Sequence, residues 1–246
     1  MQPIEILESI RQNIRKVIVG RTDTIDLLLT SLVAGGHVLL EDVPGTGKTL
    51  LAKSLAKSMS LVFSRIQFTP DLLPSDVTGL NYFDQKESAF VLQKGPVFTH
   101  ILLADEINRA TPRTQSSLLE SMEEHQVTID GETYLLDEPF FVIATQNPVG
   151  SAGTQLLPQA QLDRFMVRLE MGYPDFASQV NILRDRQTGD PLEAVATVSS
   201  CAEVLAMQKE AQSVHMADAL LEYVTSLAEA SRSHPLTVLG VSPRGA

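Results

Sequence analysis

The sequence predicts an α/β fold, in which helices flank a parallel sheet, followed by a small all-helical domain. Short apolar runs that fit buried strands alternate with helical patterns of about ten to fifteen residues, which is typical of parallel βαβ units. The strand patterns stop after Tyr173-Pro174, and only helical periodicity follows. We therefore expect an α/β core over residues 1–174 and a helical domain over residues 175–246.

The elements of the core follow from the spacing of apolar residues. Residues 4–18 have helical spacing, residues 37–41 form a short apolar run that fits a buried strand, and residues 48–59 return to a helical pattern. The other strand candidates are residues 65–68, 101–104, 140–145 and, more weakly, 166–169.

Two inserts interrupt this alternation. Residues 81–94, within the stretch 81–98, read as a strand, a polar turn and a second strand. Residues 126–136 place Asp130-Gly131 between two β-rich arms, which is a strong signal for a two-residue hairpin turn. We expect a β-hairpin at each position.

The composition restricts the function classes and the compartment. The chain has 246 residues and a formal net charge of −11, which argues against a broad DNA-binding face, since such faces bind phosphates through Lys and Arg. Cys201 is the only cysteine in the sequence, which excludes an internal disulfide and favours a reducing compartment. No apolar run is long enough to cross a bilayer, and the first residues lack the pattern of a signal peptide. We expect a cytoplasmic protein without membrane insertion.

A Gly-Thr-Gly-Lys-Thr sequence begins at Gly45, after a strand pattern and before a helical one. Backbone N–H groups near Gly45 and Gly47 can approach phosphate oxygens, and the helix start adds its positive dipole end. Lys48 can reach the terminal phosphates, and the Thr49 hydroxyl can hold Mg²⁺. A complete P-loop has a glycine where this chain has Asp42. We interpret Asp42 as a residue of the strand-to-loop junction that makes no phosphate contact.

Phosphoryl chemistry also needs a carboxylate for the metal and a group that orients the attacking water. The apolar run 101–104 ends in Asp105 and Glu106. Adjacent residues at the end of a strand can point in different directions, so Asp105 can meet Mg²⁺ while Glu106 faces the γ-phosphate.

Two further polar residues are candidates for the same site. Asn147 follows the strand candidate 140–145 and could sense the γ-phosphate, and the alternative is that it caps the turn before Pro148. Arg164 lies on a short polar helix before the last strand, where an ion pair with Asp163 is the alternative. The five histidines have no metal-ligand spacing, so we assign no zinc site.

These motifs, in their order, resemble those of an AAA+ P-loop ATPase, and more specifically those of the MoxR family. The short motifs are VPGTGKT, LLADE, ATQNP, LDRF and the SPR of residues 242–244. The MoxR resemblance covers nearly the whole chain and rests on residues 65–79, 94–124, 127–148 and 157–174. It implies an AAA+ core with a helical lid. Because the chain stops two residues beyond Arg244, we expect the lid to be incomplete.

The resemblance implies a role for each matching residue. Lys48 and Thr49 match Walker A, and Asp105 and Glu106 match Walker B. Asn147 matches sensor 1. The remaining matches are Arg164 to the arginine finger, which acts on ATP in the next subunit, and Arg244 to sensor 2, which reaches the nucleotide from the lid.

The resemblance also implies the nucleotide-binding set and the cofactors, ATP and Mg²⁺. In this class the segment Ile18-Val19-Gly20 contacts adenine, while Thr49 and Asp105 hold the metal. The expected cofactor-binding residues are Val19, Gly20, Pro44, Gly45, Thr46, Gly47, Lys48, Thr49, Leu50 and Asp105.

If Arg164 acts on the ATP of the next subunit, a single subunit is an incomplete enzyme. We therefore expect the chain to assemble into a ring, most simply a hexamer. The family is associated with chaperone-like maturation of partner complexes, often with a von Willebrand factor A domain protein, and some members help to insert metals or cofactors into enzymes. Both inserts correspond to segments that contact substrate near a central pore in such ATPases. Two alternatives stay open: a DNA-directed motor or loader with the same core, and a nucleotide-gated binding module with negligible turnover.

Overall fold

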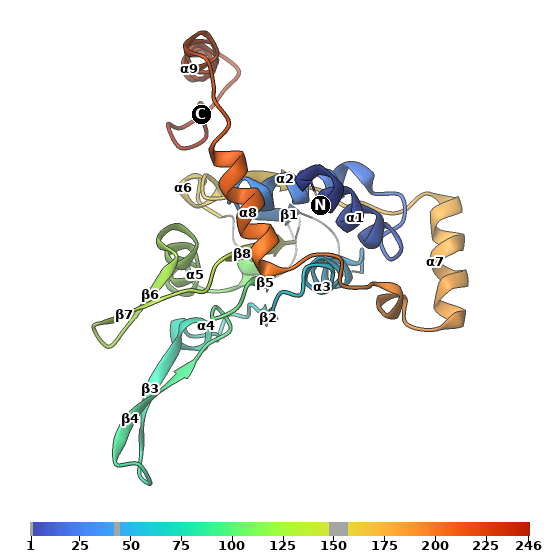
Figure 1. The fold of residues 1–246 in the computed structure, drawn as a ribbon. Coiled ribbons are helices and arrows are strands. Elements are labelled where there is room, and N and C mark those ends of the chain that lie inside the picture. Colours follow the sequence, from blue (N-terminus) through green and yellow to red (C-terminus); the bar gives the residue numbers. More distant parts are fainter. Residues whose placement is uncertain (1, 42–44, 148–156) are drawn as a thin grey trace.

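The computed structural model describes residues 2–41, 45–147 and 157–246 (Figure 1). Its centre is a five-stranded sheet in which all neighbouring strands are parallel, in the order β2-β5-β8-β1-β9. The strands are β2 (Phe63–Gln67), β5 (Ile101–Asp105), β8 (Phe141–Gln146), β1 (Val38–Glu41) and β9 (Val167–Leu169). The predicted α/β class with a parallel sheet is confirmed.

Successive residues of the central strands face opposite sides of the sheet, as the pleat requires. In β1, Val38 and Leu40 belong to one buried apolar cluster and Leu39 belongs to the other. In β5, Leu103 lies in the first cluster and Leu102 in the second. The sheet therefore has an apolar layer on each face, and each layer needs a cover of helices.

Helices from the first part of the chain cover one face. They are α1 (Pro3–Arg15), α2 (Thr22–Val33) and α3 (Lys48–Ser58), whose buried side chains join the cluster of Val38 and Leu40. Later in the chain, α8 (Cys201–Gln212) packs against α2 and adds to the same cluster.

The opposite face is covered by α4 (Pro74–Thr78) and α5 (Pro112–Glu124), which pack against each other. The start of α5 is set by Thr111, whose side chain accepts a hydrogen bond from the Thr114 N–H, and by the proline at the first helical position. The helix ends at His125, which has a φ of +51°. The buried side chains that anchor α5 to this face include Leu118, Leu119 and Met122.

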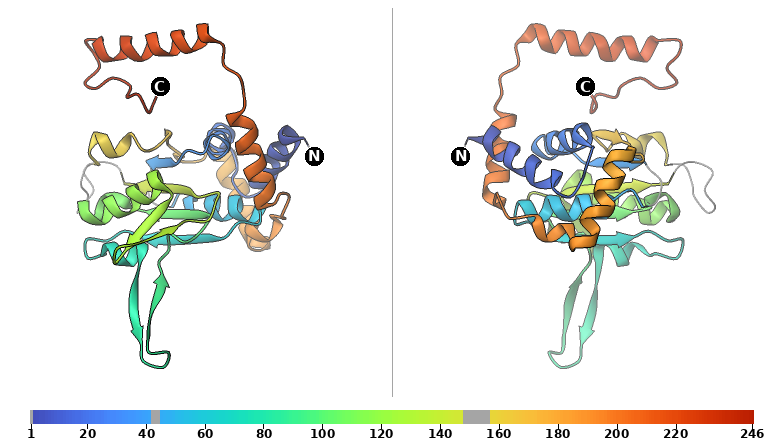
Figure 2. Two further views of the ribbon diagram at one scale, coloured as in Figure 1. Left: turned by 60° about the vertical axis from the view of Figure 1, so that its left-hand side comes forward. Right: turned by 90° about the vertical axis from the view of Figure 1, so that its right-hand side faces the viewer.

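A hairpin of β3 (Gly79–Asp84) and β4 (Ala89–Lys94) projects from the core on the side of α4 (Figures 1 and 2). It occupies the first predicted insert. Phe83 and Phe90 meet edge to face on this hairpin with their ring centroids 5.4 Å apart, and both rings are more than half exposed, at 53% and 74%. Aromatic rings on a projecting hairpin are available to a partner molecule.

The second predicted insert is a hairpin of β6 (Gln126–Ile129) and β7 (Glu132–Leu135). Its turn residues Asp130 and Gly131 have φ values of +52° and +85°. Positive φ at both central residues is the requirement of a two-residue type I′ turn, which explains the Asp-Gly pair.

The last part of the described chain is helical, as the periodicity indicates, but its helices lie in different places. The short α6 (Gln159–Leu162) precedes β9, and α7 (Phe176–Thr188) stands beside the core (Figure 1). After α8, an extended segment leads to α9 (Asp218–Ser233), which stands apart from the sheet (Figure 2). None of the helices in the described ranges is long and apolar enough to cross a membrane.

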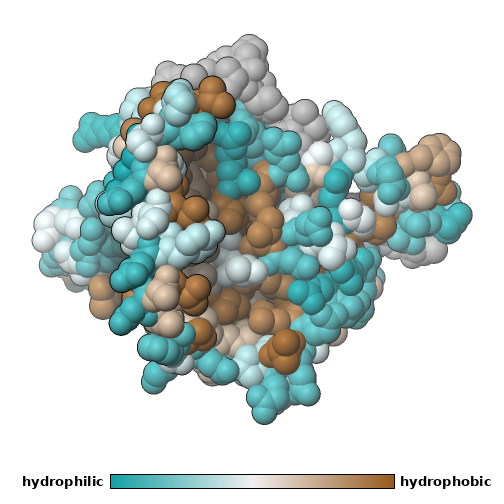
Figure 3. All heavy atoms as spheres, turned by 90° about the horizontal axis from the view of Figure 1, so that it is seen from above, coloured by the Kyte–Doolittle hydropathy of each residue, from teal (hydrophilic) through white to brown (hydrophobic). Residues whose placement is uncertain are grey.

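One side of α9 is apolar and largely uncovered. Seen from the side of α9, apolar side chains gather along a hollow between this helix and the core (Figure 3). Ala228 is the buried residue of α9, whereas its large apolar side chains are about half exposed. These exposed side chains are Leu220, Leu221, Tyr223 and Leu227. The division into two domains near residue 175 stays a prediction.

Candidate active site

The predicted phosphate loop joins β1 to α3. Gly45 and Gly47 have φ values of +87° and +91°, in the left-handed region that residues with side chains rarely adopt. Gly47 is the N-cap of α3, and Lys48 and Thr49 are the first two residues of that helix. A helix start with glycine before it offers backbone N–H groups and the positive dipole end to an anion. Lys48 is only 8% exposed, so its side chain is held within the protein.

A cavity of about 330 Å³ opens beside the loop. On one side it is lined by Gly45, Thr46, Gly47 and Leu50, and on another by Val19, all of which the sequence predicts for nucleotide binding. The remaining lining includes Gly172, Tyr173 and Pro174 before α7, and Gln179, Ile182 and Leu183 on α7. A phosphate chain seated at the glycines would place the attached nucleoside between α7 and the segment that follows α1. Gly20 lines a neighbouring hollow, and Pro44 lies outside the described residues.

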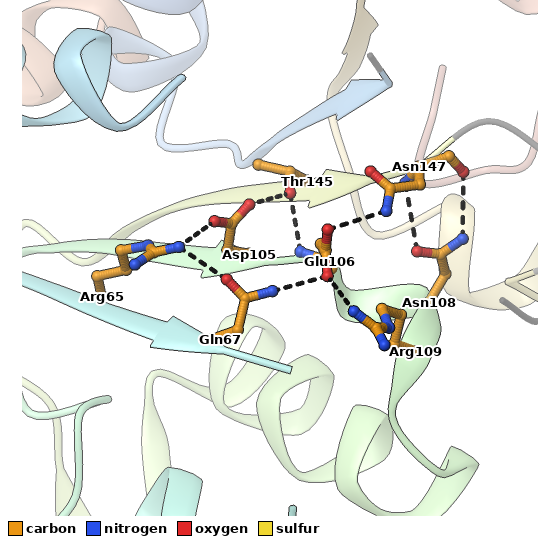
Figure 4. A network of polar contacts seen from close by, with 8 residues as sticks. All are labelled: Arg65, Gln67, Asp105, Glu106, Asn108, Arg109, Thr145 and Asn147. Carbon is orange, nitrogen blue, oxygen red and sulfur yellow. Dashed lines mark hydrogen bonds and ion pairs between the residues drawn. The ribbon is translucent and has the colours of Figure 1, made fainter. Parts of the chain in front are cut away.

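Asp105 is the last residue of β5, and each of its carboxylate oxygens has its own partner (Figure 4). Oδ1 accepts a hydrogen bond from Thr145 Oγ1 at 2.6 Å, and Oδ2 accepts one from an Arg65 guanidinium nitrogen at 2.6 Å. Because β1 and β5 are parallel members of one sheet, Asp105 and the P-loop lie at the same, carboxyl edge. Asp105 is therefore a carboxylate of fixed orientation near the start of α3.

Glu106 follows Asp105 directly and makes hydrogen bonds with four residues (Figure 4). Its backbone N–H donates to Thr145 Oγ1 at 2.8 Å. One carboxylate oxygen, Oε1, accepts from Asn147 Nδ2 at 2.9 Å. The other, Oε2, accepts from Gln67 Nε2 at 2.8 Å and from an Arg109 guanidinium nitrogen at 2.9 Å. The side chain is therefore fixed at the edge of the sheet where the P-loop lies.

The backbone and the charge of Glu106 are both unusual. Its φ and ψ of +56° and +46° are left-handed for a residue with a side chain, a conformation that costs on the order of 1–3 kcal/mol. Burial raises the pKa of the carboxyl group, but the hydrogen bonds from Arg109 and Asn147 and the charge of Arg109 outweigh it. The resulting pKa lies below the ordinary value, so the carboxylate is ionised at neutral pH.

Asn147, the residue after β8, is oriented by a second asparagine. Asn108 Nδ2 donates to the Asn147 carbonyl at 3.2 Å, and the Asn147 N–H donates to Asn108 Oδ1 at 3.3 Å. This reciprocal pair fixes the backbone of Asn147 and leaves its side chain directed at Glu106 (Figure 4). Asn147 therefore lies beside the carboxylate of Glu106, and its role as a sensor of the γ-phosphate stays a prediction.

Arg65 connects the two carboxylates from β2. The same guanidinium nitrogen that binds Asp105 also donates to Gln67 Oε1 at 2.7 Å. With its amide oxygen turned to Arg65, Gln67 presents its amide NH₂ to Glu106. One network thus joins Asp105, Glu106 and Asn147 through side chains of β2 and β8 (Figure 4).

Arg164 and Arg244 lie in a different place. Both line a second hollow, of about 510 Å³, that shares no described lining residue with the cavity at the P-loop. Both pair with Glu123 at the end of α5: an Arg164 nitrogen is 3.2 Å from Glu123 Oε2, and an Arg244 nitrogen donates to Glu123 Oε1. Within the described contacts, the alternative pair of Arg164 with Asp163 does not occur. Arg244 is likewise absent from the described lining of the cavity at the P-loop.

Several residues of the site carry no signal in the sequence. Gln67, Arg109 and Thr145 all act on Glu106, yet only their places at or near strand ends could have suggested them. One side of the cavity beside the P-loop comes from α7, whose helical periodicity is predicted but whose position is not. Groups of three or more His, Cys, Asp or Glu with the geometry of a metal site are absent from the described part of the chain.

The profile of the ATPase family associated with various cellular activities (AAA) matches residues 37–167, which include the P-loop, both carboxylates and Asn147. The protein named Chaperone MoxR1 of Mycobacterium tuberculosis is 40% identical over 229 residues, or 93% of this chain. The chain belongs to the MoxR family of AAA+ ATPases. Family membership makes it an ATPase in the general sense.

The chain is also similar to two further proteins. The protein named YeaC of Bacillus subtilis is 50% identical over 234 residues, which are 95% of this chain and 73% of YeaC. A crystal structure of a protein from Cytophaga hutchinsonii with an ATPase assignment superposes with a TM-score of 0.89 at 41% identity, over 98% of this chain and 76% of that one. The chain spans 60% of the length of Chaperone MoxR1.

Proposed function

We propose that this MoxR-family ATPase hydrolyses ATP to ADP and phosphate at the subunit interfaces of a ring, hexameric in the expected case, and that hydrolysis remodels a partner protein. The observation that carries the proposal is the arrangement at one edge of the sheet. There, the P-loop, Asp105 and a Glu106 held by Asn147 lie together, whereas Arg164 lies outside this cavity.

Nucleotide binding is assigned to the loop and to the cavity beside it. Backbone N–H groups around Gly45 and Gly47 take the phosphates, and Lys48 pairs with the terminal ones. Val19 and the α7 side of the cavity enclose the nucleoside, since they line the same space as the loop. The adjacent Gly20 has a φ of +74°, which fits a turn in the segment assigned to adenine.

The oxygen donors here suit Mg²⁺. A hydroxyl at the first turn of α3, from Thr49, and the carboxylate of Asp105 are hard oxygen ligands, and Mg²⁺ is usually held by one or two such side chains together with phosphate oxygens. When bound, the ion neutralises charge that develops on the phosphates. Thr145 keeps Asp105 oriented through the hydrogen bond to Oδ1.

Glu106 is assigned to the attacking water. Its lowered pKa keeps it ionised, so that it can accept a hydrogen bond from water and orient it toward the γ-phosphate. Asn147 Nδ2, now on Glu106 Oε1, is also a donor that a γ-phosphate oxygen can use. Occupation of the site is thereby linked to the position of Glu106.

The position of the arginines supports completion of the site by a neighbouring subunit. Arg164 and Arg244 share a hollow away from the P-loop cavity of their own chain. A guanidinium that acts on the γ-phosphate of the next subunit can be worth roughly 10³–10⁵ in rate. Assembly therefore activates hydrolysis, and each interface can pass a change of nucleotide state to its neighbour.

The conformational change that ATP hydrolysis drives is assigned to a protein partner. The projecting β3–β4 hairpin exposes Phe83 and Phe90, a composition that suits contact with protein, and the net charge of −11 disfavours nucleic acid. One relative carries the name chaperone. We assign the chain to the cytoplasm, with a von Willebrand factor A domain protein or an enzyme under maturation as the partner.

The test is the dependence of ATPase activity on protein concentration, with and without DNA. A ring enzyme gains specific activity as subunits assemble, and sedimentation of the same samples with ATP should show the assembly. Stimulation by DNA would instead favour a DNA-directed motor. Nucleotide binding with no turnover at any concentration would favour a nucleotide-gated binding module.

A further inference from the structure

Two arginines from distant parts of the sequence meet on one carboxylate. Arg164 follows α6, and Arg244 lies 121 residues away from Glu123 in the sequence. Each arginine uses a different oxygen of Glu123, Oε2 for Arg164 and Oε1 for Arg244. Asp163 lines the same hollow, but both described ion pairs are made to Glu123.

Glu123 stands on a well-anchored element. It lies in the last turn of α5, next to Met122, which is buried against the sheet. The carbonyl of Met122 accepts a hydrogen bond from His37 Nε2 at 3.0 Å, which ties this end of α5 to the segment before β1. The backbone that carries Glu123 is therefore anchored to the core, and its side chain is shorter than that of either arginine, so it has fewer rotatable bonds.

The electrostatics of the trio favour a positioning role for the carboxylate. Two guanidinium groups at one place repel each other, and a single carboxylate between them offsets part of this repulsion. The side chains of Arg164 and Arg244 are 30% and 48% exposed, so each faces solvent on one side. A guanidinium has five N–H donors, and one bond to Glu123 leaves others for an anion.

We infer that Glu123 is a positioning residue that holds Arg164 and Arg244 side by side, so that both act on the phosphates of one nucleotide in the neighbouring subunit. The inference rests on the proposed function, because it needs the arginines to act in trans. Glu123 itself touches no nucleotide in this scheme, since the P-loop cavity of its own chain lies elsewhere.

Replacement of Glu123 by Gln removes the negative charge with which both arginines pair. The two guanidinium groups should then repel each other and move apart. Misplacement of a catalytic group by about 1 Å can cost on the order of 10²-fold in rate. We expect Glu123→Gln rings to lose about tenfold or more in kcat while their nucleotide Kd stays unchanged. Glu123→Asp keeps the charge and should recover part of the rate. The matched control is Glu124→Gln, an exposed neighbour on the same helix, which should behave like the parent.

The deciding experiment uses mixed rings. Lys48→Ala subunits keep their arginines but lack a working P-loop, and Arg164→Ala subunits keep the pocket but lack the finger. Their mixture should hydrolyse ATP only where an Arg164→Ala pocket meets the arginines of a Lys48→Ala subunit. Glu123→Gln should then lower the rate when placed in the Lys48→Ala subunit and leave it unchanged in the Arg164→Ala subunit. A general folding or assembly defect would lower the rate from either side.

Equal effects from both sides, or a rate of the Glu123→Gln ring at or above the parent, overturn the inference while the trans arrangement stands. If the simple mixture of Lys48→Ala and Arg164→Ala stays inactive while parent rings are active, the trans arrangement fails, and the role of Glu123 fails with it. The two failures are therefore distinguishable by whether the mixture without any Glu123 substitution is active.

Discussion

The side-chain amide of Asn147 donates a hydrogen bond to Glu106, with 2.9 Å between Nδ2 and Oε1. This contact joins the end of β8 to the end of β5 and is one of the bonds that lower the pKa of Glu106. If Asn147 exchanges this bond for one to the γ-phosphate, Glu106 becomes free to meet water only when ATP is bound. The contact therefore links nucleotide occupancy to the reactive carboxylate.

Asn147→Ala should reduce kcat by about a factor of 10² at neutral pH, because it removes the donor that we propose for the γ-phosphate. It should also raise the pKa of Glu106, since one of the hydrogen bonds that lower it is lost. Glu106 acts as the carboxylate, so the acid limb of the kcat/KM profile, which reports groups of the free enzyme, should move to higher pH. Measurement of kcat at neutral pH and of kcat/KM from pH 4 to 8 checks the two effects, and a kcat/KM limb at the parental pH would contradict the assigned contact.

Lys48→Ala should lose ATP binding, because in the proposed function Lys48, at the start of α3, supplies a cation to the terminal phosphates. Equilibrium binding of a fluorescent ATP analogue measures the loss directly. The control is Lys53→Ala, an exposed position on the same helix, which should bind as the parent does. Unaltered affinity in Lys48→Ala would remove the P-loop assignment.

Glu106→Gln should bind ATP with near-parental affinity and hydrolyse it at least about a hundredfold more slowly, because an amide cannot accept a proton from water as a carboxylate does. Gln can still accept a hydrogen bond from Arg109 through its oxygen, so the fold around the site should persist. Parallel measurement of Kd and single-turnover hydrolysis checks the separation. A loss of binding equal to the loss of rate would mean that Glu106 serves the nucleotide and not the water.

The contiguous part of the site could be predicted from the sequence, and its surroundings could not. Gly45 to Thr49 lie in one loop, and Asp105 and Glu106 are neighbours at the end of one apolar run, so their proximity follows from local pattern. Gln67 and Thr145 each reach Glu106 across 39 residues of sequence, through a strand order that periodicity does not contain. The parallel sheet was predictable from alternation, whereas the β2-β5-β8-β1-β9 order was not.

The same distinction holds for the arginines. Arg164 and Arg244 belong to two separate sequence motifs, and the spacing of these motifs does not indicate that both arginines pair with Glu123. Their meeting depends on where the chain travels after α8, because the helical pattern of the last residues fixes the elements without fixing their positions. Side-chain contacts between remote segments are set by tertiary packing, which overrides local propensity.

The acid stability of the fold should depend on His37, which is buried and only 4% exposed. Its Nδ1 accepts from the Val142 N–H at 3.1 Å, and its Nε2 donates to the Met122 carbonyl. Burial lowers the pKa of His37 from 6.5 to about 4, against a smaller opposite effect of the Met122 carbonyl. The folded ring therefore resists protonation where the unfolded one accepts it. This contribution to stability is complete above pH 6.5 and is lost as the pH falls toward 4.

Between pH 7 and pH 5 the difference amounts to about 2 kcal/mol in the free energy of unfolding. Urea denaturation at both pH values measures the free energy of unfolding. Between pH 7 and pH 5 the parent should lose more of it, by this amount, than His37→Gln, which has no ring to titrate. The control His215→Gln lies at an exposed position and should keep the parental pH dependence. If His37→Gln does not fold, the NMR titration of His37 in the parent replaces it, with no protonation expected above pH 5. A midpoint near 6.5 in that titration would contradict the buried, neutral ring.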